Sequence, residues 1–260
     1  IESVLYPAGY SMMLTTSGFS TDIELRNIRQ LLHRKADGLI IVPYIPVNTA
    51  GYQHSYLEVL SASGCPAVFA DRIPPDSERL DYVVQNDYEA ASEAVKILHA
   101  EGCRRPGCLS FNLDASSVNN RIRGYTDTLG ALGIKLNDGM IIRLDRQDET
   151  ADDLKTALIK TARRGELDGL LVTTGGLAHK TGYLIRTEPG LNGLKGMPVA
   201  KFGKDPDHFD SGMIQIIQPN IEMGKKAAET LLDKLSGKKK ETVQLKINCT
   251  IAARRRENET

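Results

Sequence analysis

The feature that most constrains the fold is a repeated alternation between short apolar runs and longer segments with helical periodicity. The runs Gly38–Val42 and Gly169–Thr173 are rich in Leu, Ile and Val. Segments such as Ile23–Arg34 place their apolar side chains on one face of a helix. Strands that alternate with helices of about 10–15 residues are typical of parallel sheets built from βαβ units. The sequence therefore predicts an α/β fold.

The alternation continues along the whole chain without a low-complexity linker, so two lobes would be joined by short ordered crossings. We predict strands over Ser11–Thr15, Gly38–Val42, Pro66–Ala70, Gly107–Phe111, Met140–Ile142, Gly169–Thr173, Val199–Phe202, Met213–Ile217 and Thr242–Ile247. We predict helices over Ile23–Arg34, Tyr56–Ser63, Tyr88–Glu101, Val118–Leu132, Ala151–Arg164, Leu177–Thr187 and Ile221–Leu235. Gly64 and Gly102 follow two of these helices, at the position where glycine commonly ends a helix.

The charge balance argues against a chain that holds nucleic acid by itself. Lys plus Arg and Asp plus Glu both number 33, so the formal net charge is zero. Nucleic-acid affinity usually depends on a basic excess. The absence of Trp and the aromatic content of 5% also disfavour a base-stacking surface. The basic run Arg254–Arg256 is short and terminal, so we interpret it as a solvated end.

The cysteine pattern indicates neither a metal site nor a disulfide framework. The close pair Cys103 and Cys108 is spaced more widely than a zinc knuckle and has no second pair. We expect the four cysteines to be small buried apolar residues in a reducing compartment. Because the sequence shows no run of 18 apolar residues and no secretion leader, we expect a cytoplasmic protein, without metal or cofactor.

Sequence signatures of enzymes are mostly missing. The chain has no phosphate-binding loop, no nucleophile elbow, no zinc-protease motif and no dinucleotide fingerprint after its first strand. The five histidines lack metal-ligand spacing, and His208 is interpreted as a polar loop residue. Thr173–Gly176 follows a strand and opens a helix, where free amides can meet an anion or a hydroxyl-rich ligand. Such a segment is equally often a simple tight turn.

Asp71 and Arg72 lie directly after the predicted strand Pro66–Ala70. Ligands of open α/β sheets bind outside the carboxyl ends of the strands. An acidic acceptor beside a planar cationic donor suits vicinal hydroxyls or a phosphate. An ordinary surface turn would nevertheless show the same pair of residues.

Several stretches in the same order resemble the LacI/GalR family of bacterial transcription regulators. These stretches are AGYSMMLTTS at 8–17, ADGLII at 36–41, GCPAVFADR at 64–72, VQND at 84–87, RIRGY at 121–125 and QPNIEMG at 218–224. Together they cover nearly the whole chain, and their combined order is more specific than any one motif.

The resemblance implies a type I periplasmic-binding-protein fold, with two Rossmann-like lobes joined by three crossovers. The first lobe would contain residues 1–86 and 220–241, and the second would contain 87–219 and 242–260. In the family, a DNA-binding headpiece, a first strand and a helix precede the stretch at 8–17. Residues 1–6 resemble the end of that helix, so the resemblance implies that the first strand is missing from this sequence.

The resemblance also implies which residues contact an effector in a cleft between the lobes. Asp71 and Arg72 correspond to contacts of the first lobe with sugar hydroxyls or phosphate. Arg121 corresponds to the effector-binding arginine of the second lobe. Thr174 stands where many members have Asn, and Gln218 occupies a crossover position that can touch ligand.

Two departures from the family pattern bear on the ligand. Thr174 and Gly175 replace the usual Asn-Asp, and Phe202-Gly203-Lys204-Asp205 replaces the usual segment with an acidic third residue. Both resemble the fructose-repressor subgroup. Because Arg72, Arg121 and Lys204 could converge on an anion, the resemblance leaves two classes of ligand open: a neutral sugar and a sugar phosphate.

We therefore expect the effector-sensing and dimerisation domain of a LacI-type regulator, which is not an enzyme. It would bind a sugar or sugar phosphate, form a homodimer, have no membrane partner, and reach operator DNA through a headpiece outside these residues. One alternative is an extracytoplasmic sugar-binding protein of a transporter, and another is an α/β enzyme such as a sugar isomerase or kinase. A winged-helix headpiece of the GntR type in front of the same domain also stays open.

Overall fold

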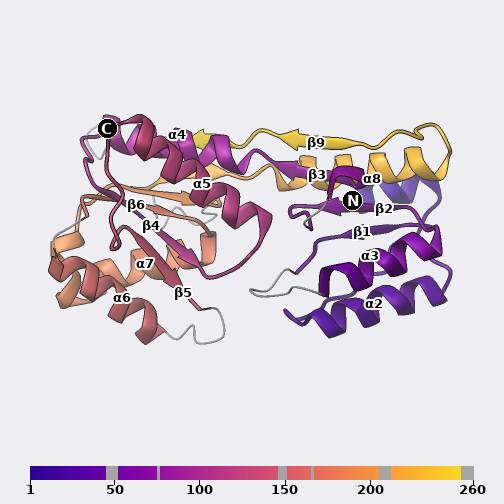
Figure 1. Ribbon diagram of the computed structural model, residues 1–260, viewed down its shortest axis with the longest axis horizontal. Helices are drawn as coiled ribbons and strands as arrows, with labels where there is room; N and C mark the ends of the chain where they lie inside the picture. The colour runs from indigo at the N-terminus through magenta and orange to yellow at the C-terminus, as the bar shows by residue number, and fades with distance from the viewer. Residues whose placement is uncertain (45–51, 75–76, 146–150, 165–166, 205–211, 253–260) are drawn as a thin grey trace. The chain divides into compact units, whose positions relative to one another are not determined.

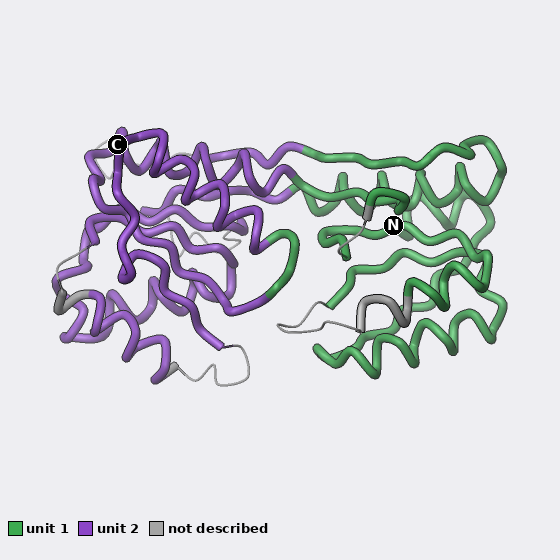
Figure 2. Tube along the Cα trace, viewed as in Figure 1, with its two compact units in different colours: residues 1–85, 114–117, 219–247 green, residues 86–113, 118–218, 248–260 purple. Residues whose placement is uncertain are grey.

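The computed structural model describes residues 1–44, 52–74, 77–145, 151–164, 167–204 and 212–252. The predictions for His208 and for Arg254–Arg256 lie outside the described residues. The chain divides into two compact units, coloured separately in Figure 2. Unit 1 contains residues 1–85, 114–117 and 219–247, and unit 2 contains residues 86–113, 118–218 and 248–260.

Unit 1 is built on a parallel sheet with the strand order β1-β2-β3-β9. Its strands are β1 (Leu39–Ile41), β2 (Ala67–Ala70), β3 (Asp81–Gln85) and β9 (Gln244–Ile247). Its helices are α1 (Glu2–Leu5), η1 (Tyr6–Ala8), α2 (Thr21–His33), α3 (Tyr52–Ser63), η2 (Ser77–Arg79) and α8 (Asn220–Leu235).

The two faces of this sheet carry separate apolar cores because side chains of a strand alternate between faces. On one face, Phe69 of β2 packs with Ile28 of α2 and Leu60 of α3. On the other face, Val68 of β2 packs with Ala227 of α8. Figure 1 shows α2 and α3 together on one side of these strands. Because the strands are parallel, their carboxyl ends lie together at one edge of this sheet.

Unit 2 is built on a six-stranded sheet with the order β10-β8-β7-β6-β4-β5, in which β10 is antiparallel to β8 and the other described pairings are parallel. Its strands are β4 (Pro106–Phe111), β5 (Ile141–Leu144), β6 (Gly169–Val172), β7 (Val199–Phe202), β8 (Ile214–Ile217) and β10 (Thr250–Ala252). Its helices are α4 (Asp87–Ala100), α5 (Ser116–Ala131), α6 (Ala151–Arg164), α7 (Gly175–Thr187) and η4 (Pro189–Leu194).

The predicted fold class is confirmed, since both units are α/β bodies on parallel sheets. The chain passes between the units after Gln85, before Pro219 and after Ile247, and the short segment 114–117, between two segments of unit 2, belongs to unit 1. The strand predicted over Thr242–Ile247 forms as β9 but pairs with β3 in unit 1, whereas the family resemblance implies that residues 242–260 belong to the second lobe.

The strand predicted over Ser11–Thr15 is wrong. This segment has no assigned strand, and Met12, Met13 and Leu14 are exposed there. Its apolar, extended pattern satisfies a strand locally, but a strand also needs a hydrogen-bonding neighbour, and none of the described strands pairs with it. No helix among the described residues combines the length and the apolar character needed to cross a membrane.

Candidate functional site

Asp71 and Arg72 lie at the carboxyl end of β2, as the sequence predicts. Asp71 has a φ of 64°, and the Arg72 N–H donates to the carbonyl oxygen of Ala70 at 2.6 Å. Positive φ is costly for residues other than glycine, although Asp tolerates it better than most. The bond from the Asp71 N–H to the Val83 carbonyl, at 3.1 Å, holds this turn against β3. The structure therefore keeps a strained turn at the carboxyl edge of the sheet.

The side chains of this turn form the Asp71–Arg72 pair. Arg72 Nε lies 3.3 Å from Asp71 Oδ2, and each side chain is 25% exposed. Arg72 Nε is itself buried without a well-aligned hydrogen bond to the described residues. A donor and an acceptor are thus fixed side by side on two partly exposed side chains, which suits recognition of hydroxyl groups.

Glu24 of α2 lies near this pair, and sequence reasoning missed it. Its side chain is 7% exposed, and Oε2 accepts a hydrogen bond from the Tyr44 N–H at 3.0 Å. Burial raises the pKa of Glu24, while the Tyr44 N–H and the Arg72 charge lower it. An acidic residue in the first turns of a helix is usually explained by the helix dipole, so the sequence carried no signal for burial.

Arg121 of α5 is the centre of a buried group in unit 2, which we call the Arg121 cluster. Its Nε donates to Asp87 Oδ1 at 2.7 Å, and its Nη1 donates to the Thr173 carbonyl at 2.5 Å. Its guanidinium carbon lies 4.0 Å from the ring centroid of Phe202. Arg121 and Asp87 are 4% and 3% exposed. The described contacts use Nε and Nη1, and leave Nη2 as the nitrogen that a ligand could engage.

The members of the Arg121 cluster come from two neighbouring strands of the unit 2 sheet and from helices α4 and α5. Thr173 follows β6 and Phe202 ends β7, while Asp87 is the first residue of α4, where a carboxylate is favoured by the helix dipole. Cys249 lies near the cluster. Burial, aided by the Asp87 charge, raises the pKa of its thiol to about 12. Cys249 is therefore an unreactive thiol here.

Thr174 is the N-cap residue of α7 but makes no side-chain capping bond. Its hydroxyl oxygen is buried without a hydrogen-bond partner among the described residues. Gly203, with a φ of 111°, approaches closely: a Cβ built there would lie 3.2 Å from the Gly175 Cα. The first amides of a helix lack intrahelical partners. The end of α7 therefore offers amides and a hydroxyl beside the Arg121 cluster.

Lys204 and Gln218 complete the predicted set. Lys204 is exposed and follows β7 by two residues, and Gln218 is half-buried and directly follows β8. Since β7 and β8 are parallel neighbours, both residues lie at the carboxyl edge of the sheet. The structure thus groups Arg121, Thr174 and Lys204 within unit 2, and Asp71 with Arg72 within unit 1.

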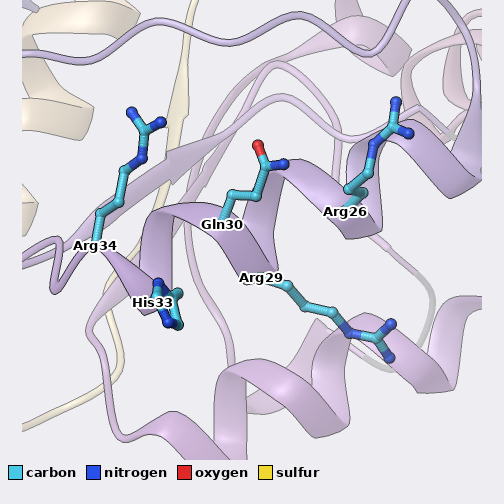
Figure 3. Close-up of a pocket in the computed structure, with 5 residues that line it drawn as sticks. All are labelled: Arg26, Arg29, Gln30, His33 and Arg34. Carbon is cyan, nitrogen blue, oxygen red and sulfur yellow. The ribbon is translucent and has the colours of Figure 1, made fainter.

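A surface pocket of about 560 Å³ lies along α2, and none of the predicted site residues lines it. It is lined by Arg26, Arg29, Gln30, His33 and Arg34. Figure 3 shows Arg26 and Arg34 projecting to one side of the helix and Arg29 to the other. Because the cationic groups do not converge, this basic groove lacks the arrangement of an anion site. No group of three potential metal ligands occurs among the residues searched, which are the described ones.

Comparison with known proteins gives a consistent result. The family "Periplasmic binding proteins and sugar binding domain of LacI family" matches residues 1–255. The HTH-type transcriptional repressor PurR of Vibrio atlanticus is 24% identical over 92% of this chain and 69% of its own length. The probable HTH-type transcriptional regulator EndR of Paenibacillus polymyxa is 28% identical over 85% of this chain and 63% of its own length. These relatives are transcription regulators and not enzymes.

Solved structures share the fold. A putative ribose operon repressor from Burkholderia thailandensis has a TM-score of 0.80 at 19% identity, covering 96% of this chain and 90% of its own. The regulator CelR in complex with cellobiose has a TM-score of 0.79 at 21% identity, covering 97% and 75%. CcpA of Lactococcus lactis has a TM-score of 0.81 at 17% identity, covering 98% and 90%.

Proposed function

We propose that this chain, which belongs to the family of periplasmic binding proteins and LacI-type sugar-binding domains, senses a sugar or sugar phosphate for a transcription regulator. The chain covers the effector-binding domain of that family. The ribose repressor of Haemophilus influenzae and the CelR–cellobiose complex support a sugar as the effector. Repressors among the relatives favour the regulator over a transporter protein. In this proposal the protein is a regulator and not an enzyme, and it acts in the cytoplasm, where operator DNA lies.

The Arg121 cluster is the observation that carries this proposal. It places a buried, oriented guanidinium beside the first amides of α7 and beside the Thr174 hydroxyl, which has no hydrogen-bond partner in the part of the chain that the structure describes. Polar groups held ready at the carboxyl edge of a parallel sheet are typical of ligand sites in α/β proteins. A hydroxyl-rich ligand supplies both the donors and the acceptors that these groups need.

We further propose that the Asp71–Arg72 pair, Arg121, Thr174, Lys204 and Gln218 are the residues that contact the ligand. A ligand that prefers one arrangement of the units shifts the population toward it. To reverse a strong bias, the ligand needs about 5 kcal/mol of differential affinity. A few charge-assisted hydrogen bonds, each worth about 1.5–3 kcal/mol, are enough to supply this difference in affinity. A homodimer would pass the change to a paired DNA-binding headpiece, since operators are commonly near-palindromic.

A thermal-shift panel of neutral sugars and their phosphate monoesters tests the proposal. A specific ligand stabilises by mass action, by about 2.7 kcal/mol at one hundred times its Kd. We expect one sugar, or its phosphate, to raise the Tm of the wild type in a saturable manner. Thr174→Val, which keeps the shape and removes the unpartnered hydroxyl, should reduce that ligand's affinity. Thr187→Val, at the other end of α7, is the matched control. A panel without any saturable shift would remove the proposal.

A further inference from the structure

Two carboxylates, those of Asp71 and Glu24, lie near the single guanidinium of Arg72. Asp71 is the direct ion partner of Arg72, at 3.3 Å. Glu24 is hydrogen-bonded to Tyr44, which stands three residues after Ile41 of β1. Arg72 likewise stands three residues after Phe69, the register partner of Ile41 in β2. In agreement, the Arg72 charge lowers the pKa of the buried Glu24 carboxyl. With all three groups ionised, two negative charges and one positive charge sum to a net charge of −1. Arg72 is therefore already more than neutralised by described residues before any ligand arrives.

A hydrogen bond and the packing around it hold the Glu24 carboxylate in position. Its Oε2 is held by the Tyr44 N–H at 3.0 Å. The ring of Tyr44 packs edge-on against Phe19, with ring centroids 5.8 Å apart. Ser20 caps the start of α2 by accepting a hydrogen bond from the Ile23 N–H at 3.3 Å. The carboxylate is thus anchored through both the helix that carries it and the segment that follows β1.

One acceptor atom and one donor atom at this place lack a hydrogen-bond partner among the described residues. Glu24 Oε1 and Arg72 Nε are both buried without a hydrogen-bond partner among the described residues. Buried polar atoms without partners are costly, so they favour a guest that brings complementary groups. A hydroxyl group both donates and accepts, whereas a phosphate at neutral pH mainly accepts and brings negative charge.

We propose that Glu24 is a specificity-determining residue that excludes phosphate from the Asp71–Arg72 pair, so that the part of the ligand bound there is uncharged. The inference rests on the proposed function, because it concerns the same ligand. It narrows the ligand class: any phosphate on the effector is directed away from Arg72. In unit 2, by contrast, Arg121, Asp87 and Lys204 sum to a net charge of +1.

Isothermal titration calorimetry with three proteins tests the inference: the wild type, Glu24→Gln and Asp22→Asn. Each neutral sugar that shifts the Tm is titrated beside its phosphate monoester. Glu24→Gln removes the buried charge and keeps an oxygen for the Tyr44 N–H. Asp22→Asn makes the same charge change at an exposed position two residues earlier in α2. Because removal of the buried charge of Glu24 weakens the Coulomb repulsion of a phosphate at the Asp71–Arg72 pair, Glu24→Gln should shift the affinity ratio toward the phosphate about tenfold.

The control should change this ratio less than about twofold, because an exposed charge is largely screened. An equal ratio for Glu24→Gln and Asp22→Asn would overturn the inference while leaving the sugar-sensing function in place. A failure of every sugar and phosphate to bind would instead overturn the proposed function and this inference with it. If Glu24→Gln does not fold, Asp71→Asn takes its place, because it removes the second carboxylate near Arg72. This variant must then move the affinity ratio in the same direction.

Discussion

At the scale of single residues, the buried ion pair of Asp87 and Arg121 should matter most for stability. Removal of one partner leaves an uncompensated buried charge, so Asp87→Ala should lower the free energy of unfolding by about 3–5 kcal/mol. The double variant Asp87→Ala/Arg121→Met removes both charges and should be more stable than Asp87→Ala. Urea denaturation measures both. A double variant that is less stable than Asp87→Ala would show that the pair is not the origin of the loss.

Glu24 makes a residue-scale prediction about pH. Its pKa is raised from 4.5 in the folded protein, mainly by burial. Between 4.5 and that raised value the folded state binds more protons than the unfolded state, so the wild type loses stability as the pH rises through this window. The side-chain amide that Glu24→Gln introduces does not titrate. The stability of Glu24→Gln relative to the wild type should therefore increase between pH 4 and pH 7 in urea titrations, and a decrease would contradict the assignment.

At the scale of elements, helices α4 and α5 approach closely at Gly124. A Cβ at this position would clash with the Tyr88 carbonyl oxygen and lie 3.2 Å from the Ala91 Cβ. Gly124→Ala should therefore destabilise the protein by about 1–3 kcal/mol. Gly130, in the same helix, has no atom within 4 Å of such a Cβ. Gly130→Ala should instead stabilise by up to about 1 kcal/mol through helix propensity. Thermal unfolding measures the Tm of both variants. A Tm change of the same sign in both would contradict this packing.

Elements with a long, regular pattern could be predicted from the sequence, and elements that depend on a neighbour could not. The period of apolar residues predicts α2, and α6 matches its predicted bounds of Ala151–Arg164. The strand β3 was missed because Asp81 and Gln85 at its ends are polar. The strand β10 was missed because its sequence, Thr250-Ile251-Ala252, contains a single large apolar residue, whereas the equally short β1 contains three. The segment Ser11–Thr15 fails for the opposite reason, since it has the pattern without a partner strand.

The candidate site divides in the same way. The position of Asp71 and Arg72 after a strand follows from local sequence, and it is confirmed. The bond between Arg121 and Asp87 joins residues 34 positions apart, and the burial of Glu24 depends on Tyr44 twenty positions later. Such contacts are set by the packing of elements, which no local pattern encodes. The roles of the six predicted site residues in binding stay predictions.

At the scale of the whole molecule, the two units depend differently on chain continuity. Unit 1 takes α8 and β9 from residues 219–247, and α8 covers one face of β2 through Met223, Ala227 and Leu231. A fragment of residues 1–85 lacks this cover and should show no cooperative unfolding transition. A fragment of residues 86–218 loses only the edge strand β10 from its sheet and should unfold cooperatively. Circular dichroism during urea titration tests both, and cooperative unfolding of residues 1–85 would refute the argument.

The contacts around Arg121 have a consequence for the entropy of binding. A flexible arginine loses rotamer freedom when it grips a ligand, and each such immobilised side chain costs about 0.5–1.5 kcal/mol. Asp87, the Thr173 carbonyl and the Phe202 ring have already selected one rotamer for Arg121 during folding. That loss of freedom therefore belongs to folding and not to binding, and a small ligand with few contacts can still bind through this arginine.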